Sequence, residues 1–143
     1  MASASLLAYF VLIFGPRMSG SPHPSRRILV VAADDNFSGT IGRILCRCGY
    51  TIERVGSGEA AMDALDRHAY DLVLSEVALP GVCGLTLLCS TRQHGRTTPF
   101  VLLGMTDTER RRWIVSGVEG VHCLPLPLDV DRLKQVVADC LAA

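Results

Sequence analysis

Short apolar segments alternate with amphipathic segments along most of the chain, from Arg27 onward. Five of the apolar segments are predicted to form strands: RILVVA (27–32), TIERV (51–55), DLVLSEV (71–77), PFVLLG (99–104) and VHCL (121–124). The first is a nearly continuous apolar run bounded by polar residues, which is typical of a strand buried on both faces.

Apolar residues recur at helical spacing after each predicted strand. The predicted helices start at Asp34–Asn36 and end at Gly49, and then cover residues 57–68, 84–93, 106–117 and 128–142. Ser57 and Asp129 are suited to the N-cap position, and TDTE (106–109) has the capping-box pattern. The sequence therefore predicts five strand–helix units in one domain.

Strict alternation of strands and helices predicts a parallel sheet with helices on both faces and right-handed crossovers. The predicted fold class is α/β, a flavodoxin-like three-layer sandwich with five helices and a five-stranded sheet, for which 2-1-3-4-5 is the leading order. The site of such a sheet lies beyond the carboxyl ends of the strands, where strands 1 and 3 diverge. Glu76 ends strand 3 and is the first candidate functional residue.

The first 26 residues differ from the rest of the chain. LLAYFVLIF (6–14) is apolar but shorter than the roughly 20 residues of a membrane span. It also has no preceding Lys or Arg and no clear cleavage site of a signal peptide. The following residues are rich in Gly, Pro and Ser, as in a linker. We expect residues 1–26 to form an apolar segment and a flexible linker, and residues 27–143 to form the domain. No membrane association is expected. Met18 is an alternative start of the chain.

Composition excludes several classes of protein. The 143 residues are 49% hydrophobic and 20% charged with a formal net charge of zero, so neither wholesale disorder nor a nucleic-acid partner is expected. The six cysteines include no CxxC pair and no zinc-finger spacing. Most occupy apolar positions of predicted elements, where a free Cys behaves as a small hydrophobe, and we expect reduced thiols in a cytoplasmic protein.

The segments ILVV (28–31), GEAAMDAL (58–65), YDLVLSEVALPGVCG (70–84), TPFVLL (98–103) and PLDVDRL (127–133) resemble, in order and spacing, the receiver domain of two-component response regulators. The resemblance covers residues 27 to 141. It implies a domain that receives a phosphoryl group from a histidine kinase. In the family, two acidic residues after strand 1 hold Mg²⁺, an Asp after strand 3 is phosphorylated, and a Ser or Thr and a Lys end strands 4 and 5.

Most of these functional positions carry other residues here. The resemblance places Glu76 at the phosphoacceptor position, and it places the remaining positions as follows: the acidic pair on Ala32 and Ala33, the hydroxyl on Gly104, the lysine on Leu126, the aromatic residue on Cys123 and the acid of the strand 3 turn on Cys83. A carboxylate that attacks a phosphoryl group needs Mg²⁺ and a cation to neutralise the charges involved. The sequence therefore predicts a degenerate receiver that keeps the scaffold and lacks the chemistry.

We accordingly expect no enzymatic activity, no metal and no cofactor. The predicted function is a phosphorylation-independent protein-interaction module in phosphorelay signalling, with a histidine kinase or another signalling protein as partner. Glu76 is either a mimic of a phosphorylated residue or a lining residue of a vestigial pocket.

Two alternatives remain. If strand 1 is longer or bulged, Asp34 and Asp35 form the acidic pair of a conventional receiver. A flavin-binding protein of flavodoxin type is a third interpretation, which the short loops disfavour. For the partner surface the best candidate is Arg110, Arg111 and Trp113 on the fourth helix, because Trp and Arg are favoured anchors of interfaces.

Overall fold

The computed structural model describes residues 25–105, 108–111 and 120–142. Five strands form one parallel sheet in the order β2-β1-β3-β4-β5. The strands are β1 (Arg27–Val31), β2 (Thr51–Val55), β3 (Leu72–Glu76), β4 (Phe100–Leu103) and β5 (Val121–Leu124). The helices with full bounds are α2 (Asp35–Arg47), α3 (Gly58–Arg67), α4 (Gly84–Gln93) and α6 (Val130–Leu141). The predicted fold class and strand order are confirmed.

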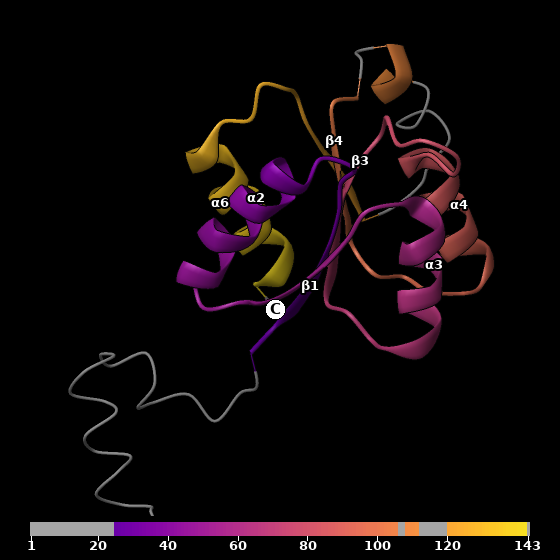
Figure 1. Ribbon diagram of the computed structural model, residues 1–143, viewed down its shortest axis with the longest axis horizontal. Helices are drawn as coiled ribbons and strands as arrows, with labels where there is room; N and C mark the ends of the chain where they lie inside the picture. The colour runs from indigo at the N-terminus through magenta and orange to yellow at the C-terminus, as the bar shows by residue number, and fades with distance from the viewer. Residues whose placement is uncertain (1–24, 106–107, 112–119, 143) are drawn as a thin grey trace, which may run out of the picture.

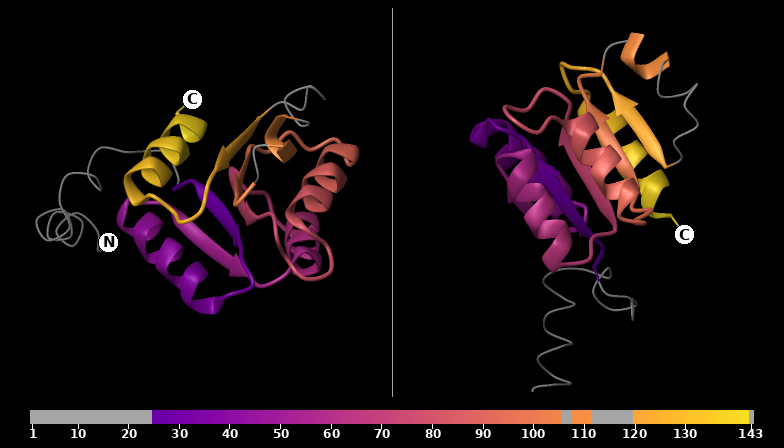
Figure 2. Two further views of the ribbon diagram at one scale, coloured as in Figure 1. Left: turned by 90° about the horizontal axis from the view of Figure 1, so that it is seen from above. Right: turned by 90° about the vertical axis from the view of Figure 1, so that its right-hand side faces the viewer.

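Helices cover both faces of the sheet (Figure 1). The helices α2 and α6 lie side by side on one face, and α3 and α4 lie on the other, as the two views of Figure 2 also show. Each face has its own apolar cluster, with Ile41, Leu45, Leu133 and Val137 on the first and Ala61, Leu65, Leu87 and Leu88 on the second. Alternate residues of the central strands point into the two clusters, which explains their nearly continuous apolar sequences.

The predicted caps start three of the helices. Asp34 accepts hydrogen bonds from the backbone N–H groups of Asn36 and Phe37 at the start of α2. Ser57 accepts from the N–H of Ala60, and Asp129 accepts from the N–H of Arg132. These bonds satisfy backbone donors that have no partner within the helix.

Part of the predicted fourth helix is observed. Residues 108–111 are helical, and Arg110 and Arg111 are exposed. Residues 106–107, with which the predicted capping box begins, and residues 112–117, which include Trp113, lie outside the described residues. Residues 1–24 of the predicted N-terminal segment also lie outside them. Among the described residues, no helix is both long enough and apolar enough to cross a membrane.

The cysteines are less buried than the apolar positions predicted for most of them would suggest. All six are free thiols, but Cys46, Cys48 and Cys89 are exposed and the other three are only partly buried. The helix α2 buries Ile41 and Leu45 against the sheet, so Cys46, one position further round, points away from it. Cys48 is the C-cap and lies beyond the last turn.

Candidate functional site

The carboxyl ends of four neighbouring strands meet at one edge of the sheet. In the register of the sheet, Val31 of β1 lies beside Ser75 of β3, and Glu76 lies beside Leu103 of β4. Leu103 in turn lies beside Leu124 of β5. The residues that follow β1, β4 and β5 are therefore brought to the same edge as Glu76, as the sequence predicted.

Glu76 is partly buried and its carboxylate has a backbone partner. The Oε1 atom of Glu76 accepts a hydrogen bond of 3.0 Å from the N–H of Ala33. This bond ties the β1–α2 loop to the end of β3. The carbonyl of Glu76 accepts a bond of 2.8 Å from the Ser75 hydroxyl and lies against Gly84, where a Cβ atom would collide with it. The close approach explains why a glycine starts α4.

The two residues at the positions of the family's acidic pair offer no carboxylate oxygen. Ala32 is 2% exposed and its N–H bonds the carbonyl of Val55 at 3.2 Å. Ala33 is exposed and contributes its N–H to Glu76. A hard cation needs several oxygen ligands. Within the described part of the chain, no cluster of three or more His, Cys, Asp or Glu side chains is arranged to hold a metal.

The geometry that Asp34 and Asp35 need to replace this pair is not observed. The strand β1 ends at Val31 and α2 begins at Asp35, without the extension or bulge that this alternative requires. Asp34 caps the helix. The Asp35 side chain is 98% exposed and lies 3.4 Å from the Arg54 guanidinium, on the β2 side.

Gly104 and Leu126 occupy the positions of the family's hydroxyl and lysine, and they contact each other. Gly104 has a φ of +84°, which disfavours residues with a Cβ, and a Cβ there would lie 3.1 Å from Cδ1 of Leu126. Leu126 is 44% exposed and joined to Pro127 by a cis peptide bond. We call the region between Glu76, Gly104 and Leu126 the crevice. It presents an apolar side chain at the position where the family has a lysine.

The two cysteines near this edge have different environments. Cys123 of β5 is partly buried, and its Sγ lies 3.3 Å from Sδ of Met105. Burial raises the pKa of the Cys123 thiol, an effect that the nearby Arg110 partly offsets. Cys83 is the N-cap of α4, and its side-chain hydrogen bond with Thr86, at 3.4 Å, helps to lower its pKa.

Sequence reasoning missed three contacts of this edge. These are the bond from Ala33 to Glu76, the packing of Leu126 over Gly104, and the binding of Arg54 to the first turn of α2. The Arg54 guanidinium bonds the Ser38 hydroxyl at 3.0 Å and the Asp35 carbonyl at 3.3 Å. No sequence pattern predicts these contacts, because each depends on how residues from separate strand–helix units come together.

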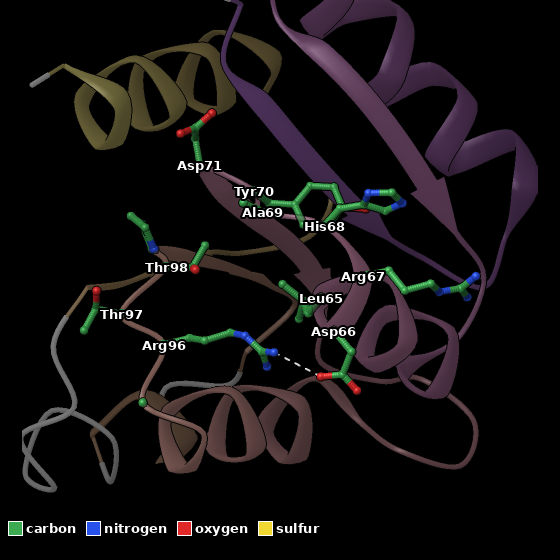
Figure 3. Close-up of a pocket in the computed structure, with 12 residues that line it drawn as sticks. Leu65, Asp66, Arg67, His68, Ala69, Tyr70, Asp71, Arg96, Thr97 and Thr98 are labelled. Atoms are coloured by element: carbon green, nitrogen blue, oxygen red, sulfur yellow. Dashed lines mark hydrogen bonds and ion pairs between the residues drawn. The ribbon is translucent and has the colours of Figure 1, made fainter.

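A separate cavity of about 640 Å³ lies at the opposite, amino-terminal edge of the sheet (Figure 3). It is formed by residues 65–71, which lead into β3, and residues 95–99, which lead into β4. An ion pair of 3.0 Å between Arg96 and Asp66 spans the two segments. This cavity contains none of the residues of the candidate site.

Comparison of the chain with known proteins identifies a matching family. Residues 28–138 match the response regulator receiver domain. The chain is 36% identical over 94 residues to the sensor histidine kinase RcsC of Salmonella typhi, covering 63% of this chain and 10% of that protein. It is 35% identical over 94 residues to the transcriptional activator protein PfeR of Pseudomonas aeruginosa, covering 66% of this chain and 30% of that protein. The chain thus spans less than a third of either of these curated relatives.

The same architecture occurs in solved structures. A putative response regulator from Chloroflexus aurantiacus is 27% identical, with a TM-score of 0.75 over 84% of this chain and all of that one. The receiver domain of the sensor histidine kinase PA1611 from Pseudomonas aeruginosa is 22% identical, with a TM-score of 0.72 over 84% of this chain and 100% of that one. At that identity, the second likeness concerns the fold alone.

Proposed function

The chain belongs to the response regulator receiver domain family, and from this premise we propose that it acts as a phosphorylation-independent protein-interaction module in two-component signalling. Its partner is a histidine kinase or another signalling protein. The observation that carries the proposal is the composition of the crevice, where Leu126 covers Gly104 and neither Ala32 nor Ala33 brings a carboxylate.

Phosphoryl transfer depends on charge neutralisation, and among the described residues no cationic side chain forms an ion pair with Glu76. Catalysis of the transfer consists almost entirely of positioning and electrostatic stabilisation by cations around the phosphoryl oxygens. Glu76 is also one methylene longer than the family's Asp, and its Oε1 is engaged by Ala33. We therefore propose that this side chain does not act as a phosphoryl acceptor.

The role of Glu76 is better described as fixing one conformation of the crevice. A carboxylate has one charge and two oxygens, against nearly two charges and three oxygens for a phosphate. The positions of the hydroxyl and the lysine that sense a phosphate in the family are occupied by Gly104 and Leu126 here. We infer that Glu76 holds the β1–α2 loop through Ala33 without reporting a signal.

A conventional receiver that used Asp34 and Asp35 would need both side chains to change partners. Asp34 would give up the cap of α2, whose loss typically costs about 1 kcal/mol. Asp35 would leave Arg54 and turn toward the crevice. Neither change brings a hydroxyl or a lysine to the site, so this alternative restores only part of the family's machinery.

The relatives support a place in signalling without naming the partner. One is described as a sensor histidine kinase and another as a transcriptional activator, and the PA1611 receiver structure is described with a magnesium ion coordinated in its active-site cleft. We propose that this chain differs from the last protein in binding no magnesium. A cytoplasmic location agrees with its six free thiols.

The proposal is tested with acetyl phosphate and Mg²⁺, a conventional receiver domain being treated in parallel. Intact-protein mass spectrometry should detect a phosphoryl adduct on the control and no adduct on this chain. A stoichiometric adduct on this chain that disappears in Glu76→Ala would refute the phosphorylation-independent function. An adduct that persists in Glu76→Ala but disappears in Asp34→Asn or Asp35→Asn would favour the rearranged receiver.

A further inference from the structure

The cavity at the amino-terminal edge of the sheet has walls that are fixed by contacts outside it (Figure 3). Its volume of about 640 Å³ lies within the range of roughly 300–1,000 Å³ that is usual for small-molecule sites. The guanidinium of Arg92 holds the 95–99 segment by donating to two of its carbonyls, at 2.8 and 3.1 Å. On the other side, the carboxylate of Asp71 accepts a 2.8 Å bond from the backbone N–H of Arg27. The cavity is therefore preformed, which lowers the entropic cost of binding a ligand.

The charged side chains of the cavity leave an excess of positive charge. Both of its carboxylates have cationic partners, since Asp66 lies 3.0 Å from Arg96 and Asp71 lies 3.7 Å from Arg26. Arg67 also lines the cavity, and it forms no ion pair among the described residues. It belongs to the last turn of α3, where the end of a helix carries about half a negative charge. The full charge of Arg67 is thus only partly offset, and the cavity favours an anion.

Arg96 is the side chain best placed to bind that anion. It reaches from the 95–99 segment to Asp66 at the end of α3 (Figure 3). The Arg96 side chain is 33% exposed and that of Asp66 is 64% exposed, so Asp66 is the more solvated partner. An exposed ion pair contributes little to stability, whereas a guanidinium binds a phosphate through two parallel N–H···O bonds. An incoming phosphate would therefore displace Asp66 at a small energetic cost.

The remaining polar groups of the cavity suit a ligand rich in hydroxyl groups. Thr97 and Thr98 line it, and neither hydroxyl forms a hydrogen bond within the part of the chain that the structure describes. Each hydroxyl both donates and accepts, and the Asp71 carboxylate can accept more bonds than the one from Arg27. Hydroxyl groups of a sugar would pair with all three of these side chains.

We propose that this cavity binds a sugar phosphate, with the phosphate on Arg96 and Arg67 and the sugar hydroxyls on Asp71 and the two threonines. A phosphate monoester has nearly two charges and three oxygens, which matches two guanidinium groups better than a carboxylate with one charge does. The site goes beyond the proposed function, because it lies at the edge of the sheet opposite to Glu76 and shares no residue with the crevice.

The test is a titration of the full chain, without Mg²⁺, with glucose 6-phosphate, inorganic phosphate or glucose, followed in ¹H–¹⁵N spectra. Glucose 6-phosphate should shift the amide signals of Arg96, Thr97 and Thr98 in a saturable way. Inorganic phosphate should bind about tenfold more weakly, and glucose should cause no shift. Arg96→Gln should weaken binding of glucose 6-phosphate about tenfold, because hydrogen bonds between charged groups are lost. Asp66→Asn should strengthen it about two- to fivefold, because the competing carboxylate is removed.

Arg67 and Arg47 provide a matched pair, because each is an exposed arginine in the last turn of its helix and only Arg67 lines the cavity. Arg67→Gln should weaken binding about threefold, and Arg47→Gln, with the same change of charge, should leave it unchanged. Equal effects of these two variants, or weaker binding by Asp66→Asn, would overturn the site. Shifts at Ala33 and Glu76 in place of the cavity signals would also overturn it, by locating the phosphate in the crevice. Equal affinities for glucose 6-phosphate and inorganic phosphate would overturn a sugar as the ligand class.

Discussion

Replacement of Gly104 by alanine measures how firmly the backbone of the crevice excludes a larger residue. The φ of +84° lies in the left-handed region, where a Cβ costs about 1–2 kcal/mol. Reduced entropy of the unfolded chain offsets about 0.4–1 kcal/mol of this penalty. The new Cβ would also lie 3.1 Å from Leu126 Cδ1, but this side chain is flexible and 44% exposed, so it can move at little cost. We expect a net loss of stability of about 1 kcal/mol.

Gly95→Ala is the matched control for the backbone term. Gly95 has a φ of +77°, and a Cβ there would meet no atom within 4 Å. The loss should again be about 1 kcal/mol, and the difference between the two variants measures the contact with Leu126. That difference should be a few tenths of a kcal/mol and should vanish when Gly104→Ala is combined with Leu126→Ala.

Urea unfolding followed by circular dichroism provides the assay. With a slope of about 2 kcal/mol per molar, a loss of 1 kcal/mol lowers the midpoint by about 0.5 M. A neutral Gly104→Ala together with a destabilising Gly95→Ala would refute the argument, because the two glycines share the same backbone conformation. The crevice would then accept a serine or threonine, and the missing hydroxyl would not reflect a constraint of the backbone.

Three further expectations follow from individual contacts. The Tyr70 hydroxyl donates a 2.6 Å bond to Glu53, and burial followed by this bond raises its pKa from 10.0 to about 12. The contribution of the protonated Tyr70 to the free energy of unfolding should therefore be fully present below pH 10 and be lost as the pH rises toward 12. The free energy of urea unfolding of a Tyr70→Phe variant should lack this decrease between pH 10 and 12. Glu76→Ala should accelerate hydrogen exchange at the Ala33 amide and Glu76→Gln should not, because only the first removes the acceptor; equal exchange in both would contradict the contact. Cys123 should react with iodoacetamide more slowly than the exposed thiols because burial raises its pKa. Mass spectrometry at short reaction times measures the order of modification, and earlier modification of Cys123 than of the exposed thiols would contradict this expectation.

The fold was predictable because each unit carries its own local signals. The bounds of β2, α4 and β5 agree with prediction, and Ser57 and Asp129 cap their helices as expected. The predicted first strand was one residue too long. Ala32 is buried and its N–H bonds Val55, yet it lies outside the strand, so apolar character alone overestimated the length.

The contents of the site were less predictable than its position. Alternation of strands and helices brings Glu76 to the edge of the sheet, but the sequence does not specify that its carboxylate bonds the Ala33 amide. The sequence also does not reveal that Leu126 lies on Gly104, since that contact depends on a positive φ and on the path of the β5–α6 loop.

If Glu76 is no phosphoryl acceptor, the crevice around it does not hold a divalent cation and a phosphate together. This is measured in ¹H–¹⁵N spectra recorded during titration with Mg²⁺ and beryllofluoride, a mimic of the phosphoryl group. We expect the amide signals of Ala33, Glu76 and Gly104 not to move. Saturable shifts of these three signals, dependent on both Mg²⁺ and beryllofluoride, would contradict it.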